Sequence, residues 1–301
     1  MGSNDLAPLP AHRVELTRTR LGYLEVNPKP TSTALEAYYR DRYFMGKGGR
    51  SQYSRTYSAE EIEHTALAVA EILAHSRSEP GRAYEAGCGE GFILKGLRDL
   101  GWQVRGVDVT IDGVEMHNPQ LRDIVDVADV FEHIDEMLDT DQRFELVVCN
   151  HVLEHVIDPI TLAAKLVRLL TDDGICRFVV PNDGSVLQHE IVRRGLAAKR
   201  YWVRYPDHLS YFTAESLTSL LISQGWQVVD LLATFPIDLF LLNPDSNYEK
   251  DSSFGRNCHL AAVAFELMLA SSGPEALTEF RRGCARAGIG RDLIAYASRQ
   301  S

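Results

Sequence analysis

The feature that most limits the fold of this chain is a glycine-rich turn between a short apolar strand and a helix. Ala83 to Ala86 is strand-like, glycines follow at Gly87, Gly89 and Gly91, and a helical pattern runs from Phe92 to Leu100. Glycine allows positive φ and lets a ligand approach the backbone closely. A turn of this kind is typical of nucleotide and cofactor sites in parallel sheets flanked by helices.

The residues in and after this turn limit its ligand. The glycine spacing is G-x-G-x-G, whereas the dinucleotide fingerprint needs glycine at the position of Phe92. Glu85 in the strand would repel a pyrophosphate but suits a cationic group. Asp108 ends the next predicted strand, where a carboxylate can accept hydrogen bonds from both ribose hydroxyls. The pattern therefore favours a nucleoside cofactor that carries a cation, and it argues against an NAD-dependent oxidoreductase.

Strand and helix patterns alternate along the rest of the chain, which predicts a parallel sheet with helices on both faces. Ser58 and Glu61 form a capping-box pattern that opens a helix, and Thr213 caps another. A turn is predicted at Asp172 to Gly174. The predicted strands are Gln103 to Val109, a weaker one at Leu121 to Val127, Phe144 to Cys149, Ile175 to Val180, Trp226 to Leu232 and Asp292 to Ala297. The predicted helices include Thr33 to Phe44, Leu162 to Leu170, His259 to Leu269 and Glu275 to Ala287.

Three stretches together resemble the successive motifs of class I S-adenosylmethionine-dependent methyltransferases. They are Glu85 to Gly91, Asp108, and the run Phe144-Glu145-Leu146-Val147-Val148-Cys149-Asn150-His151-Val152-Leu153-Glu154-His155-Val156. The resemblance covers residues 80 to 232, and within that superfamily the chain is similar to bacterial small-molecule and sugar methyltransferases. It implies a Rossmann-like, seven-stranded α/β sheet whose last strand is antiparallel.

The cofactor implied by this resemblance is S-adenosyl-L-methionine. Asp126 or Asp129 could accept a hydrogen bond from the adenine amino group, and we favour Asp129 because it stands where the strand runs out into a loop. The candidate cofactor-binding residues are Glu85, Gly87, Cys88, Gly89, Gly91, Asp108, Asp129, Asn150 and Tyr43.

We expect an N-terminal arm and helical cap over residues 1–79 and a methyltransferase domain over residues 80–301. Residues 1–20 are polar and are expected to be irregular. Tyrosines of the cap, Tyr43 among them, either pack in the core or form a lid over the cofactor. Two insertions are expected, an acceptor pocket around residues 182–212 and a helical one around residues 236–288, in which 236–257 is loop-like.

Removing a proton from an acceptor hydroxyl calls for a base, which is commonly histidine. His208 follows a proline in a turn after the fifth strand and is the first candidate. His151 and His155 follow the fourth strand and are the other two. Each could instead have a structural role. Glu154 and His155 have residue types found in metal sites, but two adjacent ligands are a weak signal, and we predict no metal.

The expected activity is methylation of a small molecule, most simply at a hydroxyl of a sugar or secondary metabolite. N- or C-methylation and cofactor binding without turnover remain alternatives. The net charge of -11 disfavours a nucleic-acid partner. The chain shows neither a membrane-spanning apolar run nor a signal-peptide pattern, and its five cysteines are dispersed, so a cytoplasmic protein is expected. A homodimer is possible.

Overall fold

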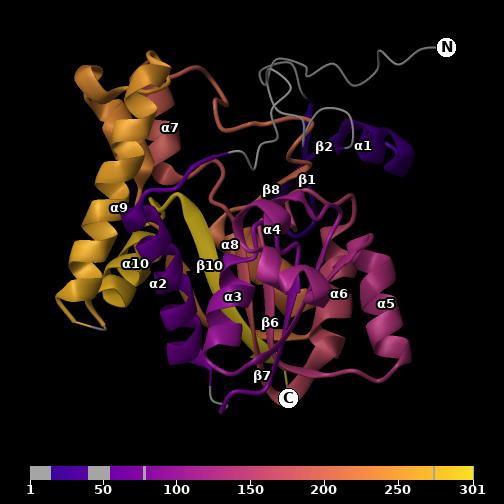
Figure 1. Ribbon diagram of the computed structural model, residues 1–301. Coiled ribbons are helices and arrows are strands. Elements are labelled where there is room, and N and C mark those ends of the chain that lie inside the picture. The colour runs from indigo at the N-terminus through magenta and orange to yellow at the C-terminus, as the bar shows by residue number, and fades with distance from the viewer. Residues whose placement is uncertain (1–14, 40–54, 77–78, 274, 301) are drawn as a thin grey trace.

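The computed structural model describes residues 15–39, 55–76, 79–273 and 275–300, and its centre is a seven-stranded sheet (Figure 1). The strand order is β5-β4-β3-β6-β7-β10-β9. Strand β10 is antiparallel to both of its neighbours, whereas β3 to β7 run parallel, which confirms the predicted fold class. The strands are β3 (Arg82–Ala86), β4 (Gln103–Asp108), β5 (Val125–Val127), β6 (Phe144–Asn150), β7 (Leu170–Pro181), β9 (Trp226–Ala233) and β10 (Asp292–Arg299).

Helices cover both faces of this sheet. On one face, α2 (Ala59–His75) and α3 (Phe92–Asp99) pack through residues such as Ile72 and Leu97. On the other, α5 (Val130–Asp139), α6 (Pro159–Leu169) and α8 (Ala214–Ser223) bury Ile134, Leu166 and Leu217. Two further helices, α9 (Gly255–Ser271) and α10 (Ala276–Ala287), stand beside α2 (Figure 1). The buried apolar faces of these helices hold the layers together, since burying one large apolar side chain contributes about 1.5–3 kcal/mol.

Two predicted helix starts are confirmed in atomic detail. The Ser58 hydroxyl accepts from the Glu61 N–H while the Glu61 carboxylate accepts from the Ser58 N–H. Thr213 and Ser216 form the same reciprocal pair at the start of α8. Each pair satisfies backbone donors that the first helical turn leaves without a partner.

A second, three-stranded sheet joins the N-terminal segment to the acceptor-pocket region. Its strands, in spatial order, are β1 (Leu16–Arg18), β2 (Leu24–Val26) and β8 (Ser210–Tyr211). The expectation of irregular structure through residue 20 was therefore wrong for Leu16–Arg18. Pairing with β2 and burial of Tyr23 against Phe212 order this stretch despite its polar sequence.

Several local predictions differ from the structure for identifiable reasons. Only Val125–Val127 of the predicted strand is extended, because Pro119 starts the 3₁₀ helix η4 (Pro119–Ile124), which buries Leu121. The predicted turn at Asp172–Gly174 lies within β7, at a register shift against β6. Helix α5 was not predicted. Further short elements are α1 (Ser32–Tyr38), α4 (Asp112–His117), α7 (Val186–Arg193), η5 (Ile237–Leu242), η6 (Pro244–Ser246) and η7 (Ser252–Phe254).

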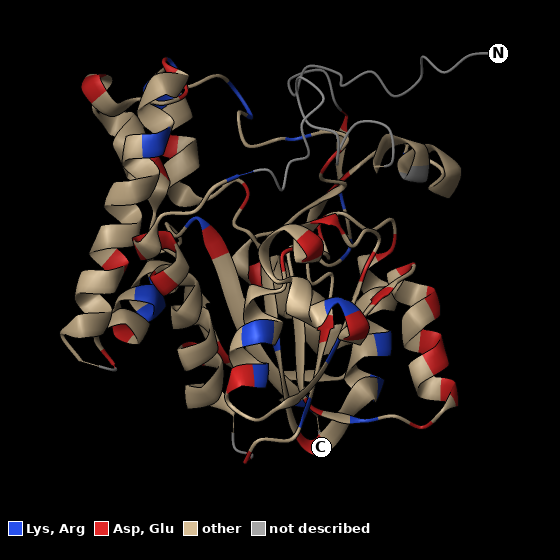
Figure 2. Ribbon diagram, viewed as in Figure 1, with Lys and Arg blue, Asp and Glu red and all other residues tan. Residues whose placement is uncertain are grey.

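The predicted N-terminal lid is only partly covered by the structure. Helix α1 ends at Tyr38, and Tyr43 lies outside the described residues, so its role remains a prediction. No helix in the described part of the chain is long and apolar enough to cross a bilayer. In the view of Figure 2, acidic residues predominate on α5, whereas basic residues are scattered.

Candidate active site

The glycine turn lies between β3 and α3, at the edge of the sheet where the parallel strands end. Gly87 and Gly89 have φ values of +70° and +53°, a region that disfavours other residues. A Cβ at Gly87 would lie 2.5 Å from Val152 Cγ2, whereas one at Gly89 would meet nothing within 4 Å. Gly87 is therefore required for packing against the turn after β6. Gly89 faces open space, where a ligand can contact the backbone.

Glu85 is a buried acid beside this turn. Its side chain is 4% exposed, and Oε2 has no hydrogen-bond partner among the described residues. Burial, together with the nearby Asp108 carboxylate, raises the pKa of Glu85 to about 8, although Arg177 acts in the opposite direction. A carboxyl group that lacks a close cation in this position fits a ligand that brings one.

Asp108 ends β4 beside the glycine turn, as predicted. Its Oδ2 accepts from the Gly89 N–H at 2.8 Å, and its Oδ1 accepts from the Thr110 N–H at 3.2 Å. Burial raises the pKa of this carboxyl group. Each carboxylate oxygen keeps a lone pair that can accept a further bond, as from a ribose hydroxyl. Cys88, in contrast, packs its side chain into the core with Leu94.

The two candidate adenine contacts have different surroundings. Asp129 is the exposed N-cap of α5, where its Oδ1 accepts from the backbone N–H groups of Phe131 and Glu132. Asp126 Oδ2 instead lies 2.9 Å from Arg105 Nε and 3.1 Å from His133 Nε2. Among the described residues, the Asp129 carboxylate has backbone partners only, whereas the Asp126 carboxylate is already held by Arg105 and His133, so the adenine prediction stays with Asp129.

The turn after β6 brings a histidine and a buried glutamate together. His151 has φ +54°, which is uncommon for a non-glycine residue, and its side chain is half exposed. Its Nδ1 lies 3.2 Å from Oε1 of Glu154, whose side chain is fully buried. Burial acts to lower the pKa of His151, but the Glu154 carboxylate outweighs it and raises the pKa. Beside them, Asn150 Oδ1 accepts from Arg177 Nη1 at 2.7 Å.

His155 and His208 also lie near Glu154, and His155 Nε2 is 3.9 Å from Glu154 Oε1. Their rings meet edge to face with centroids 4.8 Å apart, and His155 Nδ1 lies 2.6 Å from the Asp207 carbonyl oxygen. Burial and the neighbouring His155 lower the pKa of His208 to about 3. One potential ligand atom from each of Glu154, His155 and His208 lies within 4.8 Å of the others, which is a donor set that a divalent ion could use.

Asp183 was missed from the sequence. It follows β7 and is 5% exposed, and burial raises the pKa of its carboxyl group to about 8. Its backbone N–H donates to the Phe212 carbonyl, which ties it to the 201–212 segment. Nothing in the pattern Pro181-Asn182-Asp183 distinguished a buried site acid from an ordinary turn.

Buried polar atoms without a hydrogen-bond partner gather in this region. Of those found in the described residues, five belong to Glu154, Asp183, Tyr201, His208 and Ser210. The backbone joins several of them, since the Glu154 carbonyl accepts from the N–H groups of Leu209 and Ser210. Burying a polar group without a partner costs about 1–3 kcal/mol, so such a cluster indicates a site shaped for a polar ligand.

Described residues of the N-terminal region contact both the glycine turn and the residues around His155. The Tyr57 hydroxyl donates to Glu90 of the glycine turn at 2.7 Å, and its ring packs edge-on against Phe92. Near the histidines, Tyr39 Oη lies 3.1 Å from His155 Nδ1, and the Tyr38 hydroxyl donates to Asp207. These contacts place Tyr38, Tyr39 and Tyr57 beside the site rather than in the main core.

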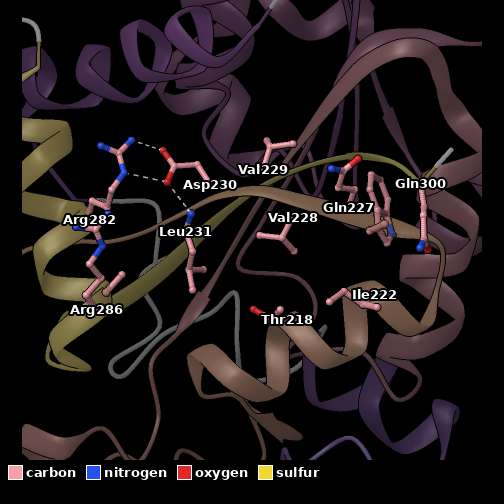
Figure 3. Close-up of a pocket in the computed structure, with 12 residues that line it drawn as sticks. Thr218, Ile222, Gln227, Val228, Val229, Asp230, Leu231, Arg282, Arg286 and Gln300 are labelled. Carbon is pink, nitrogen blue, oxygen red and sulfur yellow. Dashed lines mark hydrogen bonds and ion pairs between the residues drawn. The ribbon is translucent and has the colours of Figure 1, made fainter.

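A groove of about 820 Å³ is separate from this site (Figure 3). It runs along the edge strand β9 between α8 and α10, and Asp230 on its wall is bound by Arg282. Strands β10, β7 and β6 separate β9 from the glycine strand β3. The volume of this groove therefore does not identify it as the candidate active site.

Comparison with known proteins agrees with this geometry. The profile of a methyltransferase-domain family matches residues 57–231, more than half of the chain. A ubiquinone biosynthesis O-methyltransferase of Alkalilimnicola ehrlichii is 31% identical over 32% of this chain and 40% of its own length. A probable S-adenosylmethionine-dependent methyltransferase of Mycolicibacterium smegmatis is 28% identical over 56% of this chain and 60% of its own. The matches thus span about half the length of these relatives.

Two solved structures share the fold. A 1,6-didemethyltoxoflavin-N1-methyltransferase of Burkholderia thailandensis, with S-adenosylhomocysteine bound, covers 95% of this chain and all of its own, with 16% identity and a TM-score of 0.52. A SAM-dependent methyltransferase of Archaeoglobus fulgidus covers 80% of this chain and 94% of its own, with 16% identity and a TM-score of 0.51. The glycine turn, its acidic neighbours, the sheet order and the family match lead to one conclusion: the chain belongs to the methyltransferase-domain family and has the fold of S-adenosylmethionine-dependent methyltransferases.

Proposed function

We propose that this enzyme methylates a hydroxyl group of a small molecule, a sugar or secondary metabolite, with His151 as the general base. The observation that carries this proposal is the contact between His151 and the buried Glu154 on the turn after β6. Val152 of the same turn packs against Gly87, so the base stands beside the cofactor turn. The curated relatives named O-methyltransferases support an oxygen acceptor.

The described residues fit S-adenosylmethionine. Gly89 leaves room for the ligand, Glu85 supplies a carboxylate for its cationic groups, and Asp108 can accept from its ribose. Gly87 and Gly91 shape the turn, Cys88 and Asn150 can offer backbone groups, and Asp129 is our adenine contact. When bound, the cofactor supplies a methyl group activated by its positive sulfur, so the protein mainly aligns and desolvates the reactants.

His151 has the environment that a base for this reaction needs. With Nδ1–H donating to Glu154, Nε2 is left to take the proton of the acceptor hydroxyl, whose oxygen would replace the cofactor's sulfur on the methyl group. The Glu154 carboxylate then stabilises the imidazolium. A raised pKa above the ordinary value of about 6.5 makes His151 a stronger base, although less of it is deprotonated at neutral pH.

For His208 we now favour a contact with the acceptor over the role of base. Its pKa of about 3 keeps the ring neutral at physiological pH but makes it a poor proton acceptor. Its buried Nδ1 has no partner among the described residues and can bond a polar group of the acceptor. His155, held by Asp207 and Tyr39, fixes the position of His208 through their ring contact.

The proposal is tested with pairs of acceptors that differ only in carrying a hydroxyl or an amine. Transfer of a labelled methyl group from S-adenosylmethionine is measured for each pair. We expect hydroxyl members to be methylated with a rate that rises with pH through the titration of His151. Consistent preference for the amine members would favour N-methylation instead.

The affinity for S-adenosylmethionine is expected to rise with pH up to about 8, where the Glu85 carboxyl group titrates. A bound cation lowers the pKa of Glu85, so binding below this pH releases a proton, with a slope of at most about tenfold per pH unit. Calorimetry in buffers of different ionisation enthalpy counts the protons released. In Glu85→Gln, the contribution of the Glu85 carboxyl group to the pH dependence of cofactor affinity is removed. If the affinity of the wild type and of Glu85→Gln changed with pH in the same way, the assignment of Glu85 would be contradicted.

We expect chelation to leave turnover intact, in line with the predicted absence of a metal. His151 and Glu154 already provide a base, and a sulfonium needs no Lewis acid to release its methyl group. Initial rates are compared before and after dialysis against EDTA. Activity that is lost and then restored by magnesium or zinc would instead assign the group of Glu154, His155 and His208 to a metal ion.

A further inference from the structure

A cavity of about 220 Å³ lies between the 201–204 segment and the 237–255 segment, outside the groups assigned so far. Two arginines line it, together with the aromatic side chains of Tyr201, Trp202 and Tyr248. A space of this size holds a small ring with one polar substituent.

The arginines of this cavity have unused hydrogen-bonding capacity. Arg291 is half-buried, and its closest carboxylate is that of Asp238, at 3.9 Å, beyond hydrogen-bond distance. Asp238 already accepts from Gln188 Nε2 at 3.0 Å and from Tyr248 Oη at 2.5 Å. Within the described part of the chain, no carboxylate lies within ion-pair distance of Arg204.

The unused hydrogen-bonding capacity belongs to the arginines of the cavity and is not shared by the other arginines of the basic stretch around Arg204. Arg193 and Arg194, in the same basic stretch of sequence, are both bound by Glu190. The buried Tyr201 hydroxyl lies near the Asp238 carboxylate but makes no hydrogen bond of ordinary geometry. Arg204 and Glu249, the other charged residues of the lining, are both exposed, and the positive charge of Arg204 acts on the Glu249 carboxylate. An arginine carries five N–H donors, and Asp238 already accepts two bonds, so the guanidinium donors outnumber the acceptor positions left on the two carboxylates.

The backbone connects this cavity to the catalytic groups. The His208 N–H donates to the Arg204 carbonyl at 2.8 Å, and the Asn182 N–H donates to the Arg291 carbonyl at 2.9 Å. Asn182 is followed by Asp183, whose Oδ2 has no partner. These bonds hold the cavity beside the segments that carry His208 and Asp183.

We infer that the Arg204–Arg291 cavity binds an oxyanion of the methyl acceptor, a carboxylate or a phosphate, carried on a small ring. This inference rests on the proposed function and names its substrate class. Planar guanidinium groups bind such anions through paired N–H donors, and the aromatic walls accommodate the ring. The chain has a net charge of -11, so two arginines in one cavity form a local exception to its overall negative charge. Such a site favours acceptors that carry a negative charge over neutral ones.

The test measures binding without turnover, on the full chain saturated with S-adenosylhomocysteine. Calorimetry compares benzoate with benzamide and phenyl phosphate with phenol. We expect an anion of at least one pair to bind more tightly than its neutral partner. We also expect Arg204→Met to weaken the binding of that anion about 10- to 100-fold, as for loss of a charge-assisted hydrogen bond. If benzoate binds more tightly than phenyl phosphate, the cavity is a carboxylate site, and the reverse order makes it a phosphate site.

Arg193→Met, in the same basic stretch but outside the cavity, is the matched control and should bind the anion normally. Arg291→Lys, which keeps the charge but loses the paired donors, should show an intermediate loss. Equal affinity for anions and neutral partners, or anion binding unchanged in Arg204→Met, would overturn the inference. Because no methyl transfer is involved, either result leaves the proposed O-methylation to be judged by its own assay.

Discussion

Replacing His151 with asparagine is expected to lower kcat roughly 10²- to 10⁴-fold, the usual contribution of a general base. Asparagine is chosen because position 151 has a φ of +54°, which asparagine tolerates better than alanine. The turn that packs on Gly87 is then preserved, and the affinity for S-adenosylmethionine should stay close to that of the wild type. Steady-state kinetics and cofactor titration separate the two effects.

The pH dependence identifies the base. In the wild type, the ascending limb of kcat/KM should lie above the ordinary histidine pKa of about 6.5, because Glu154 raises the pKa of His151. Glu154→Gln removes the negative charge and should move this limb to lower pH. His208→Asn serves as the comparison and should raise KM while the limb stays in place. If the ascending limb of kcat/KM were lost in His208→Asn but retained in His151→Asn, His208 would be the base and His151 the acceptor contact.

Asp108→Ala is expected to weaken S-adenosylmethionine binding by about 1–3 kcal/mol, the range for lost hydrogen bonds to a charged group. The carboxylate both accepts from the Gly89 N–H and, in our assignment, binds the ribose hydroxyls. Calorimetry with S-adenosylmethionine and S-adenosylhomocysteine measures the loss, which should be similar for both because they share the ribose.

Asp126→Ala is the matched control, since Asp126 is an acidic residue on the neighbouring strand β5. Its carboxylate is bound to Arg105 and His133, so its removal should leave cofactor affinity unchanged. Equal affinity in Asp108→Ala and the wild type would show that the ribose contact is misplaced.

The proposed cofactor half of the candidate site was easier to predict from the sequence than the proposed acceptor half. Gly87, Gly89, Glu85 and Asp108 lie within 25 residues in a strand–turn–helix–strand unit, so local sequence rules bring them together. The alternation of strands and helices likewise predicted the sheet, since each element buries one apolar face. These features depend on short-range patterns that a single sequence displays.

The acceptor half depends on contacts between distant segments. Asp183 is buried just after β7, where its N–H donates to the Phe212 carbonyl of the 201–212 segment, and Arg291 reaches its cavity from the residue before β10. The opposite pKa shifts of His151 and His208 likewise follow from their distances to Glu154 and from burial. Residue type and spacing alone could not rank these histidines.

The position of the transferred methyl group tests the central claim most directly. The enzyme is supplied with S-adenosylmethionine carrying a ¹³C-methyl group and an acceptor that offers both a hydroxyl and an amine. The carbon chemical shift of the purified product then identifies the atom that received the label. We predict a methyl ether, formed by the wild type and lost in His151→Asn. A product methylated on nitrogen or carbon, formed equally well by His151→Asn, would contradict the account.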